Sequence, residues 1–184
     1  MAATEPPVCD FGWQARDFDL PGVDDKRHRL AELRGANGIL VMFICNHCPY
    51  VKAVLGRIVR DASELADHGI ASVAISSNDP RAYPEDSFEN MQRVARENGF
   101  PFPYLFDESQ NVARAYDARC TPDFFGFNND LELQYRGRLD ESRTTAAPGA
   151  RRELFEAMAG IARTGKGPTD QVASIGCSIK WRDD

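Results

Sequence analysis

Two cysteines, Cys45 and Cys48, lie where a continuous apolar run over residues 38–44 ends and a stretch with helical spacing begins. A thiol placed between the carboxyl end of a buried strand and the start of a helix faces the positive end of the helix dipole, which favours its thiolate. Thiolates are nucleophiles and metal ligands. The chemistry that this motif predicts is therefore thiol redox chemistry or metal binding.

Pro49 distinguishes between the two cysteines. If the helix began at Cys45, Pro49 would stand at the fourth helical position, where its missing N–H removes the first intrahelical hydrogen bond. If Cys48 is the N-cap, Pro49 is the first helical residue, a position that favours proline. Proline also holds the residue before it in the extended geometry that an N-cap needs. We therefore predict that Cys48 has the lower pKa and is the better nucleophile.

Metal binding is the alternative for such a motif. A zinc site usually has four ligands, with a second close pair among them. The other candidate ligands show no such pair spacing: they are Cys120, Cys177, His28, His47 and His68. A zinc-binding structural protein therefore needs ligands scattered over the fold, and we expect neither a metal nor another cofactor.

The elements around the motif indicate an α/β protein. The run 38–44 has the pattern of a strand covered on both faces, and residues at helical spacing follow it. A turn at 20–25 joins two short leading strands. Later strands are expected at 70–75, 103–106, 123–127 and 131–136, and helices at 51–65, 86–98, 109–117 and 154–161, with Asp107 as an N-cap. This order predicts a mixed sheet with helices packed on it, whose active site lies at the carboxyl ends of strands.

Composition limits the class of protein. The chain has 184 residues, which suits one main domain, and a net charge of −6 without a basic run, which argues against nucleic acid as a partner. No apolar stretch approaches the roughly 18–20 residues of a membrane span. The first residues lack the pattern of a signal peptide, so we expect a cytoplasmic location, where cysteines are normally reduced.

The residues around Cys48 also carry a family resemblance. The segment 39–48 resembles the strand and active-site start of thioredoxin-fold proteins, with Cys48 at the position of the first thioredoxin cysteine and Val51 at that of the second. Cys48-Pro49 resembles the peroxidatic Cys-Pro of the alkyl hydroperoxide reductase/thiol-specific antioxidant (AhpC/TSA, peroxiredoxin) family. The resemblance spans roughly residues 11–163, and the tail motif 175–181 is similar to a subgroup of uncharacterised peroxiredoxin-like redoxins.

This resemblance implies a thioredoxin-like fold, with a central mixed β-sheet flanked by helices, an N-terminal β-hairpin and a C-terminal tail. The expected parts are a flexible arm over 1–10, the redoxin domain over 11–166 and a tail over 167–184 that packs on the domain. Thr121-Pro122 matches the cis-proline that faces the nucleophile in this fold. Val41 and Cys45 stand where peroxiredoxins have the proline and threonine of P-x-x-x-T-x-x-C.

Other residues join the candidate site through the resemblance. Cys120 is either the thiol that resolves an oxidised Cys48 or a small buried residue. Arg119 either stabilises a thiolate or peroxide or forms a surface ion pair. Cys177 either resolves Cys48 from the tail or packs as a core residue under Trp181, the expected apolar anchor of the tail. Cys45 is a further resolving candidate. His47 either supports the thiolate as a cation or lies exposed in its loop.

The function implied is that of a thiol-dependent oxidoreductase, either a peroxiredoxin-like antioxidant or a thiol–disulfide exchange protein. Its substrate would be a peroxide or a protein disulfide, and its reductant a thiol such as a thioredoxin-type protein. The Cys48-Pro49 register favours peroxide, whereas the missing proline and threonine favour disulfide exchange. A non-catalytic redox sensor or binding module is the alternative from another class.

Overall fold

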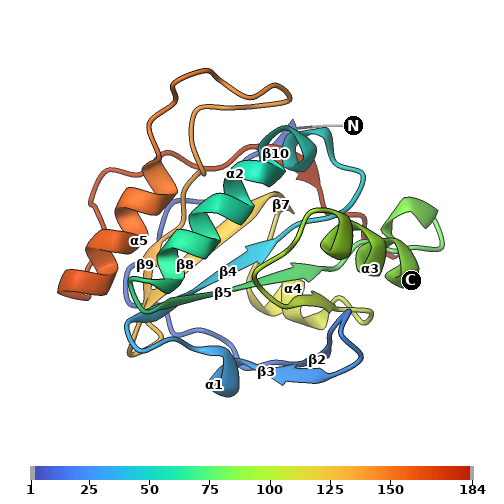
Figure 1. The fold of residues 1–184 in the computed structure, drawn as a ribbon, viewed down its shortest axis with the longest axis horizontal. Helices are drawn as coiled ribbons and strands as arrows, with labels where there is room; N and C mark the ends of the chain where they lie inside the picture. Colours follow the sequence, from blue (N-terminus) through green and yellow to red (C-terminus); the bar gives the residue numbers. More distant parts are fainter. Residues whose placement is uncertain (1–2, 183–184) are drawn as a thin grey trace.

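A five-stranded mixed sheet forms the centre of the computed structural model, which describes residues 3–182 (Figure 1). Three of its strands run parallel, and the last two form an antiparallel hairpin beside them. The strands, in sheet order, are β6 (Tyr104–Phe106), β5 (Ile70–Ser76), β4 (Gly38–Phe43), β8 (Asp123–Asn128) and β9 (Leu133–Tyr135). The mixed sheet predicted from the sequence is confirmed.

The central strand β4 is buried along its whole length because both of its faces are covered. Successive side chains of a strand point to opposite faces, and the apolar residues of this segment divide accordingly between two core clusters. One cluster contains Leu40, Met42 and Ile44, and the other contains Ile39, Val41 and Phe43. The uninterrupted apolar run is thus explained by burial on both sides.

Helices cover the two faces unequally (Figure 1). The first cluster lies under the long helices, and the second lies under α4 and the leading hairpin. The helices are α1 (Leu30–Leu33), α2 (Pro49–Ala66), α3 (Phe88–Glu97), α4 (Asn111–Ala115) and α5 (Glu153–Thr164); a short 3-10 turn, Pro84–Asp86, precedes α3. The leading hairpin consists of β2 (Asp19–Pro21) and β3 (Arg27–Arg29), as predicted.

The helix α4 differs from its prediction. It is shorter than the expected 109–117, and Gln110 occupies its N-cap position with a left-handed φ of 63°. Asp107 is therefore not the N-cap residue. Its carboxylate instead reaches the helix from the preceding turn and accepts hydrogen bonds from the backbone N–H groups of Val112 (3.4 Å) and Ala113 (2.9 Å).

A second sheet brings the end of the chain against its middle. Its order is β1 (Ala3–Thr4), β10 (Gly176–Ser178) and β7 (Cys120–Thr121), all antiparallel. The segment 1–10, expected as a flexible arm, thus contains the strand β1, which pairs with β10. The prediction that Trp181 anchors the tail is wrong, because its side chain is exposed and lies under the Arg114 guanidinium. Ile179, which is 3% exposed, provides the apolar contact instead.

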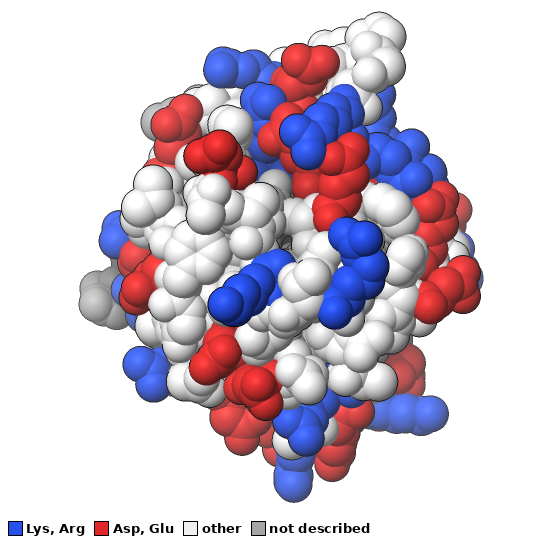
Figure 2. All heavy atoms as spheres, turned by 90° about the vertical axis from the view of Figure 1, so that its left-hand side faces the viewer, with Lys and Arg blue, Asp and Glu red and all other residues white. Residues whose placement is uncertain are grey.

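The face of the molecule on the α5 side is mixed in charge. Figure 2 shows a largely neutral central area with a few basic side chains in it, and both acidic and basic side chains around its edge. Among residues 3–182, no helix combines the length and the apolar character that crossing a bilayer requires.

Candidate active site

Cys48 is the N-cap of α2, as predicted from Pro49. Its backbone is extended, with φ −66° and ψ 123°, and Pro49 begins the helix. The Cys48 carbonyl oxygen accepts the first helical hydrogen bond, from the Lys52 N–H at 3.0 Å. The sulfur therefore lies at the end of the helix where the backbone N–H groups have no helical partners, which favours a negative charge.

Three chain segments converge on the Cys48 sulfur. It lies 3.0 Å from the Cys177 sulfur of β10 and 3.1 Å from the Thr121 carbonyl oxygen of β7. The Thr121–Pro122 peptide bond is cis, as the family resemblance implied. The Cys45 sulfur lies 3.4 Å from the Thr121 hydroxyl. Cys45, Cys48 and Cys177 are all buried and form a cluster around Thr121, which we call the thiol cluster.

Cys48 has the lowest pKa in the thiol cluster. A hydrogen bond from the Cys45 thiol lowers the pKa of Cys48 to about 4, against the opposing effect of burial, and bonds from Thr121, Cys177 and the Val51 N–H lower it further. Donating that hydrogen bond, together with burial, raises the pKa of Cys45 well above its ordinary value. Of the three thiols of the cluster, Cys48 is therefore the one that ionises most readily.

Cys177 keeps its proton for a different reason. Burial and its hydrogen bond to Cys48 raise the pKa of Cys177 to about 12. A protonated thiol next to a thiolate is the state in which the thiolate attacks first and the second thiol responds to the product. The two sulfurs in contact therefore differ in pKa: Cys48 ionises first, and Cys177 retains its proton to higher pH.

The loop between the two cysteines of the motif is fixed by a buried carboxylate. Asp86 is fully buried and accepts hydrogen bonds from the Asn46 backbone N–H (2.8 Å), the His47 Nδ1 (2.6 Å) and the Asn78 side chain (2.8 Å). The His47 ring is stacked on Tyr83, with centroids 5.3 Å apart and an interplanar angle of 7°. His47 is thus a partly buried, hydrogen-bonded residue rather than an exposed one.

Asp86 and Asn78 are the residues that sequence reasoning missed. Asp86 comes 39 positions after His47, and no spacing in the sequence links the two. The only available signal was the polar segment that follows the strand at 70–75, because such segments lie at the same sheet edge as Cys48.

Two other predicted residues lie apart from the thiol cluster. The Arg119 guanidinium is exposed and pairs with Asp117 at 2.7 Å, which is the surface ion pair considered as its alternative. Cys120 is buried, with its sulfur 3.4 Å from the Pro122 carbonyl oxygen, and burial raises its pKa. Of the candidate resolving thiols, Cys177 is the one whose sulfur contacts Cys48 at 3.0 Å.

One group of potential metal ligands occurs beside the cluster. Ligand atoms of Cys45, His47 and Asp86 lie within 4.8 Å of one another. Two ligands that share a tetrahedral zinc ion are about 3.3 Å apart, whereas His47 and Asp86 are 2.6 Å apart. This spacing is that of a hydrogen bond, and the residues as arranged do not fit a zinc ion.

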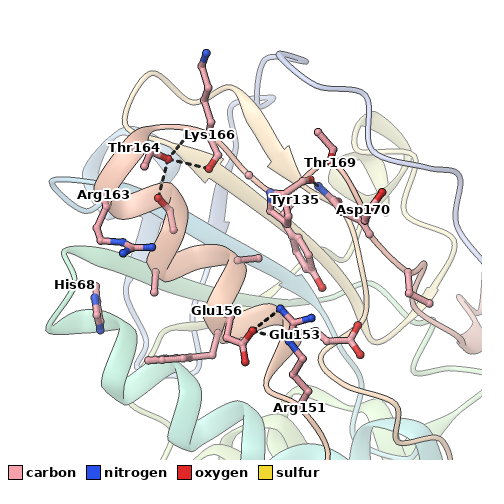
Figure 3. A pocket seen from close by; sticks show the side chains of 18 residues that line it. His68, Tyr135, Arg151, Glu153, Glu156, Arg163, Thr164, Lys166, Thr169 and Asp170 are labelled. Carbon is pink, nitrogen blue, oxygen red and sulfur yellow. Dashed lines mark hydrogen bonds and ion pairs between the residues drawn. The ribbon is translucent and has the colours of Figure 1, made fainter.

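A large hollow on the described surface lies away from the thiol cluster. It measures about 1130 Å³ and runs between α5 and the segment 166–172, with no cysteine in its lining (Figure 3). Its charged side chains include Arg151 and Glu156, which pair with each other, and Arg163. The thiol cluster is therefore a buried site, distinct from this surface hollow.

Comparisons with known proteins identify the family of the chain. The sequence matches the AhpC/TSA family over residues 11–139. The thiol-disulfide oxidoreductase ResA of Geobacillus thermodenitrificans (strain NG80-2) is 24% identical over 122 residues, which are 66% of this chain and 66% of that protein, just under two thirds of its length.

Solved structures extend the comparison. An uncharacterized conserved protein from Geobacillus kaustophilus is 47% identical, with a TM-score of 0.94 over 100% of this chain and 98% of that one. A putative thioredoxin from Neisseria meningitidis, 19% identical, shares the fold with a TM-score of 0.63 over 82% of this chain and 90% of its own. The chain has the thioredoxin fold and belongs to the AhpC/TSA family.

Proposed function

We propose that the protein is a thiol-dependent oxidoreductase in which Cys48 attacks as a thiolate and Cys177 closes a disulfide with it. The observation that carries the proposal is the 3.0 Å contact between the two sulfurs, and it is supported by the lowered pKa of Cys48 and the raised pKa of Cys177. A disulfide bond is about 2.05 Å long, so the sulfurs need to approach by only about 1 Å. The similarity to ResA supports disulfide chemistry at the level of the family.

The chemical steps balance with either substrate class. With a hydroperoxide, the Cys48 thiolate attacks the distal oxygen and the O–O bond breaks, which gives a sulfenic acid and, after protonation, an alcohol or water. The Cys177 thiol then displaces water and forms the disulfide. With a protein disulfide, Cys48 forms a mixed disulfide and releases one thiol, and Cys177 then releases the other. A thiol reductant, such as a thioredoxin-type protein in the cytoplasm, returns both sulfurs to the reduced state.

Cys45 has a supporting role in this proposal. It stands where the family pattern has threonine, and it donates the hydrogen bond that most lowers the pKa of Cys48. A protonated Cys45 therefore stabilises the attacking thiolate and is a poor nucleophile itself.

The test is turnover with a thiol reductant, assayed separately with hydrogen peroxide and with a disulfide-bonded protein. We expect Cys48→Ser to abolish turnover and Cys177→Ser to reduce it strongly and to leave Cys48 as a sulfenic acid or mixed disulfide. Cys120→Ser is the control, and its turnover should resemble that of the wild type. Full activity of the Cys48→Ser variant would overturn the proposal.

A redox sensor is the second candidate, because Cys48 and Cys177 are only 0% and 3% exposed. A sensor would lose its thiols once, in proportion to the added peroxide, without turnover in the presence of reductant. The same assay therefore separates the two functions.

A further inference from the structure

The loop of the C-x-x-C motif is connected to the tail by one buried amide. Asn78 follows β5 and is 3% exposed. Its side-chain N–H donates to Asp86 Oδ2 at 2.8 Å, the same carboxylate that holds Asn46 and His47. Its side-chain oxygen accepts a hydrogen bond from the Lys180 backbone N–H at 2.9 Å. Both ends of this amide are thus occupied, one by the motif and one by the tail.

The tail residue at the other end of this connection lies close to Cys177 in sequence. Lys180 follows β10, and its carbonyl oxygen also accepts a hydrogen bond from the Asp79 N–H at 3.0 Å. The backbone N–H and the carbonyl oxygen of Lys180 are therefore both hydrogen-bonded, to the adjacent residues Asn78 and Asp79. This attachment limits movement of β10 along its own axis.

A second contact runs parallel to the first. One face of the Tyr83 ring is stacked on His47, and the Lys180 ammonium lies 5.7 Å from the centre of the same ring. Tyr83 is half-buried, so the Lys180 ammonium remains partly hydrated in this contact. The cation–π contact therefore adds a second, weaker link between the tail and the 45–47 loop.

We propose that Asn78 and Asp86 are positioning residues for the thiol chemistry: they join the 45–47 loop to the tail and so hold Cys177 against Cys48. The inference rests on the proposed function and deepens it. Cys48 and Cys177 are 129 positions apart in the sequence, so their contact depends on how β10 is held. A small slip of the tail would separate the sulfurs while leaving both thiols intact.

The consequence is a kinetic competition at Cys48. After a hydroperoxide converts its thiolate to the sulfenic acid, the Cys177 thiol either forms the disulfide and releases water, or a second peroxide oxidises Cys48 to the sulfinic acid. A well-placed Cys177 favours the disulfide. Loss of the Asn78 link should therefore shift the products towards sulfinic acid without slowing the first oxidation.

The experiment adds increasing hydrogen peroxide to the reduced full chain, quenches it with acid and quantifies the products by mass spectrometry. We expect Asn78→Ala to slow Cys48–Cys177 disulfide formation about five- to tenfold. A change of this size corresponds to the net contribution of about one buried hydrogen bond. The peroxide concentration that gives equal amounts of disulfide and sulfinic acid should fall by the same factor. The rate of sulfenic acid formation should stay within about twofold of the wild type.

Gln110→Ala is the matched control. Gln110 also binds the tail, through the Lys180 carbonyl oxygen and the Arg182 N–H, both at 2.9 Å, but its side chain makes no hydrogen bond to the 45–47 loop among the described residues. We expect it to change the product ratio less than Asn78→Ala does. An equal effect of both variants would show that any tail attachment suffices and would overturn the inference.

If Asn78→Ala does not fold, Tyr83→Ala removes the parallel contact and should lower the same crossover concentration about two- to fivefold. If the folded Asn78→Ala protein has the same crossover peroxide concentration as the wild type, the role of Asn78 and Asp86 is overturned, while the proposed function stands. Failure of the wild type to form the Cys48–Cys177 disulfide at all would instead overturn the proposed function.

Discussion

At the scale of residues, the two cysteines of the motif differ because their interaction shifts their pKa values in opposite directions. Contact with Cys45 lowers the pKa of Cys48, while contact with Cys48, together with burial, raises the pKa of Cys45. The negative charge of Asp86 acts in the same sense, since it also raises the pKa of Cys45. The nearby carboxylate therefore reinforces the distinction that Pro49 and the helix end establish.

Substitution of Cys45 tests this direction. Cys45→Ala removes the donor, and we expect the titration midpoint of Cys48 to rise by about 1 to 2 pH units, the equivalent of one hydrogen bond to a charged group. Cys45→Ser keeps a donor and should leave the midpoint near that of the wild type. The ultraviolet absorbance of the thiolate, measured against pH relative to Cys48→Ser, reports the midpoint. Identical midpoints in the alanine and serine variants would contradict the assigned role.

At the scale of elements, β10 reaches Cys48 only because Gly176 has no side chain. A Cβ at this position would collide with the backbone carbonyl of Thr121 on the neighbouring strand. The pairing places Cys177 opposite Thr121, whose carbonyl oxygen also contacts Cys48. The close approach of two backbones therefore brings the two sulfurs together.

Gly176→Ala should push β10 away from β7 and separate the sulfurs. We expect at least tenfold slower disulfide formation after peroxide addition and a loss of about 1–3 kcal/mol in the free energy of unfolding, as for other overpacked sites. Quenched mass spectrometry and urea titration measure the two effects.

Gly160→Ala provides the control for this substitution. Gly160 lies within α5, and nothing lies within 4 Å of a Cβ added there. Alanine is the better helix former, so the variant should be about 0.5–1 kcal/mol more stable with unchanged disulfide formation. Slower disulfide formation in this variant as well would mean that the Gly176 effect is not local.

At the scale of the whole molecule, the unusual pKa of Cys48 couples folding to pH. Its pKa is about 4 in the folded protein and 9.0 for an ordinary thiol. Between these values the unfolded chain binds one proton more, so stability rises with pH, and the contribution is complete above about pH 9. Cys177, with a folded pKa of about 12, acts oppositely: its contribution is present below pH 9 and is lost as the pH rises towards 12.

The stability difference between wild type and Cys48→Ser should therefore widen from pH 5 to pH 8. The expected slope is at most about 1.4 kcal/mol per pH unit. Urea unfolding of both proteins under a thiol reductant measures it, and the Cys120→Ser variant should follow the wild type. Parallel curves for wild type and Cys48→Ser would contradict the depressed pKa.

The features that could be predicted from the sequence are those that depend on residues close together in the chain. The helix start at Cys48 and the two-sided burial of β4 are local consequences of Pro49 and of an apolar run, so they were predictable. The Asp86 carboxylate and the tail contacts depend on segments far apart in the chain, which no spacing reveals. Trp181 was misjudged because a large aromatic side chain can be retained by an Arg114 cation–π contact at the surface instead of by burial.

The beginning of the described chain lies at the strand that carries Cys177. Ala3 is paired with Cys177 itself. A purification tag placed before this segment would therefore sit close to the reactive sulfurs, and a polyhistidine tag would bring redox-active metal ions to them. The exposed turn at Asn129 and Asp130, between β8 and β9, offers a more distant place for an affinity tag or a fluorescent reporter.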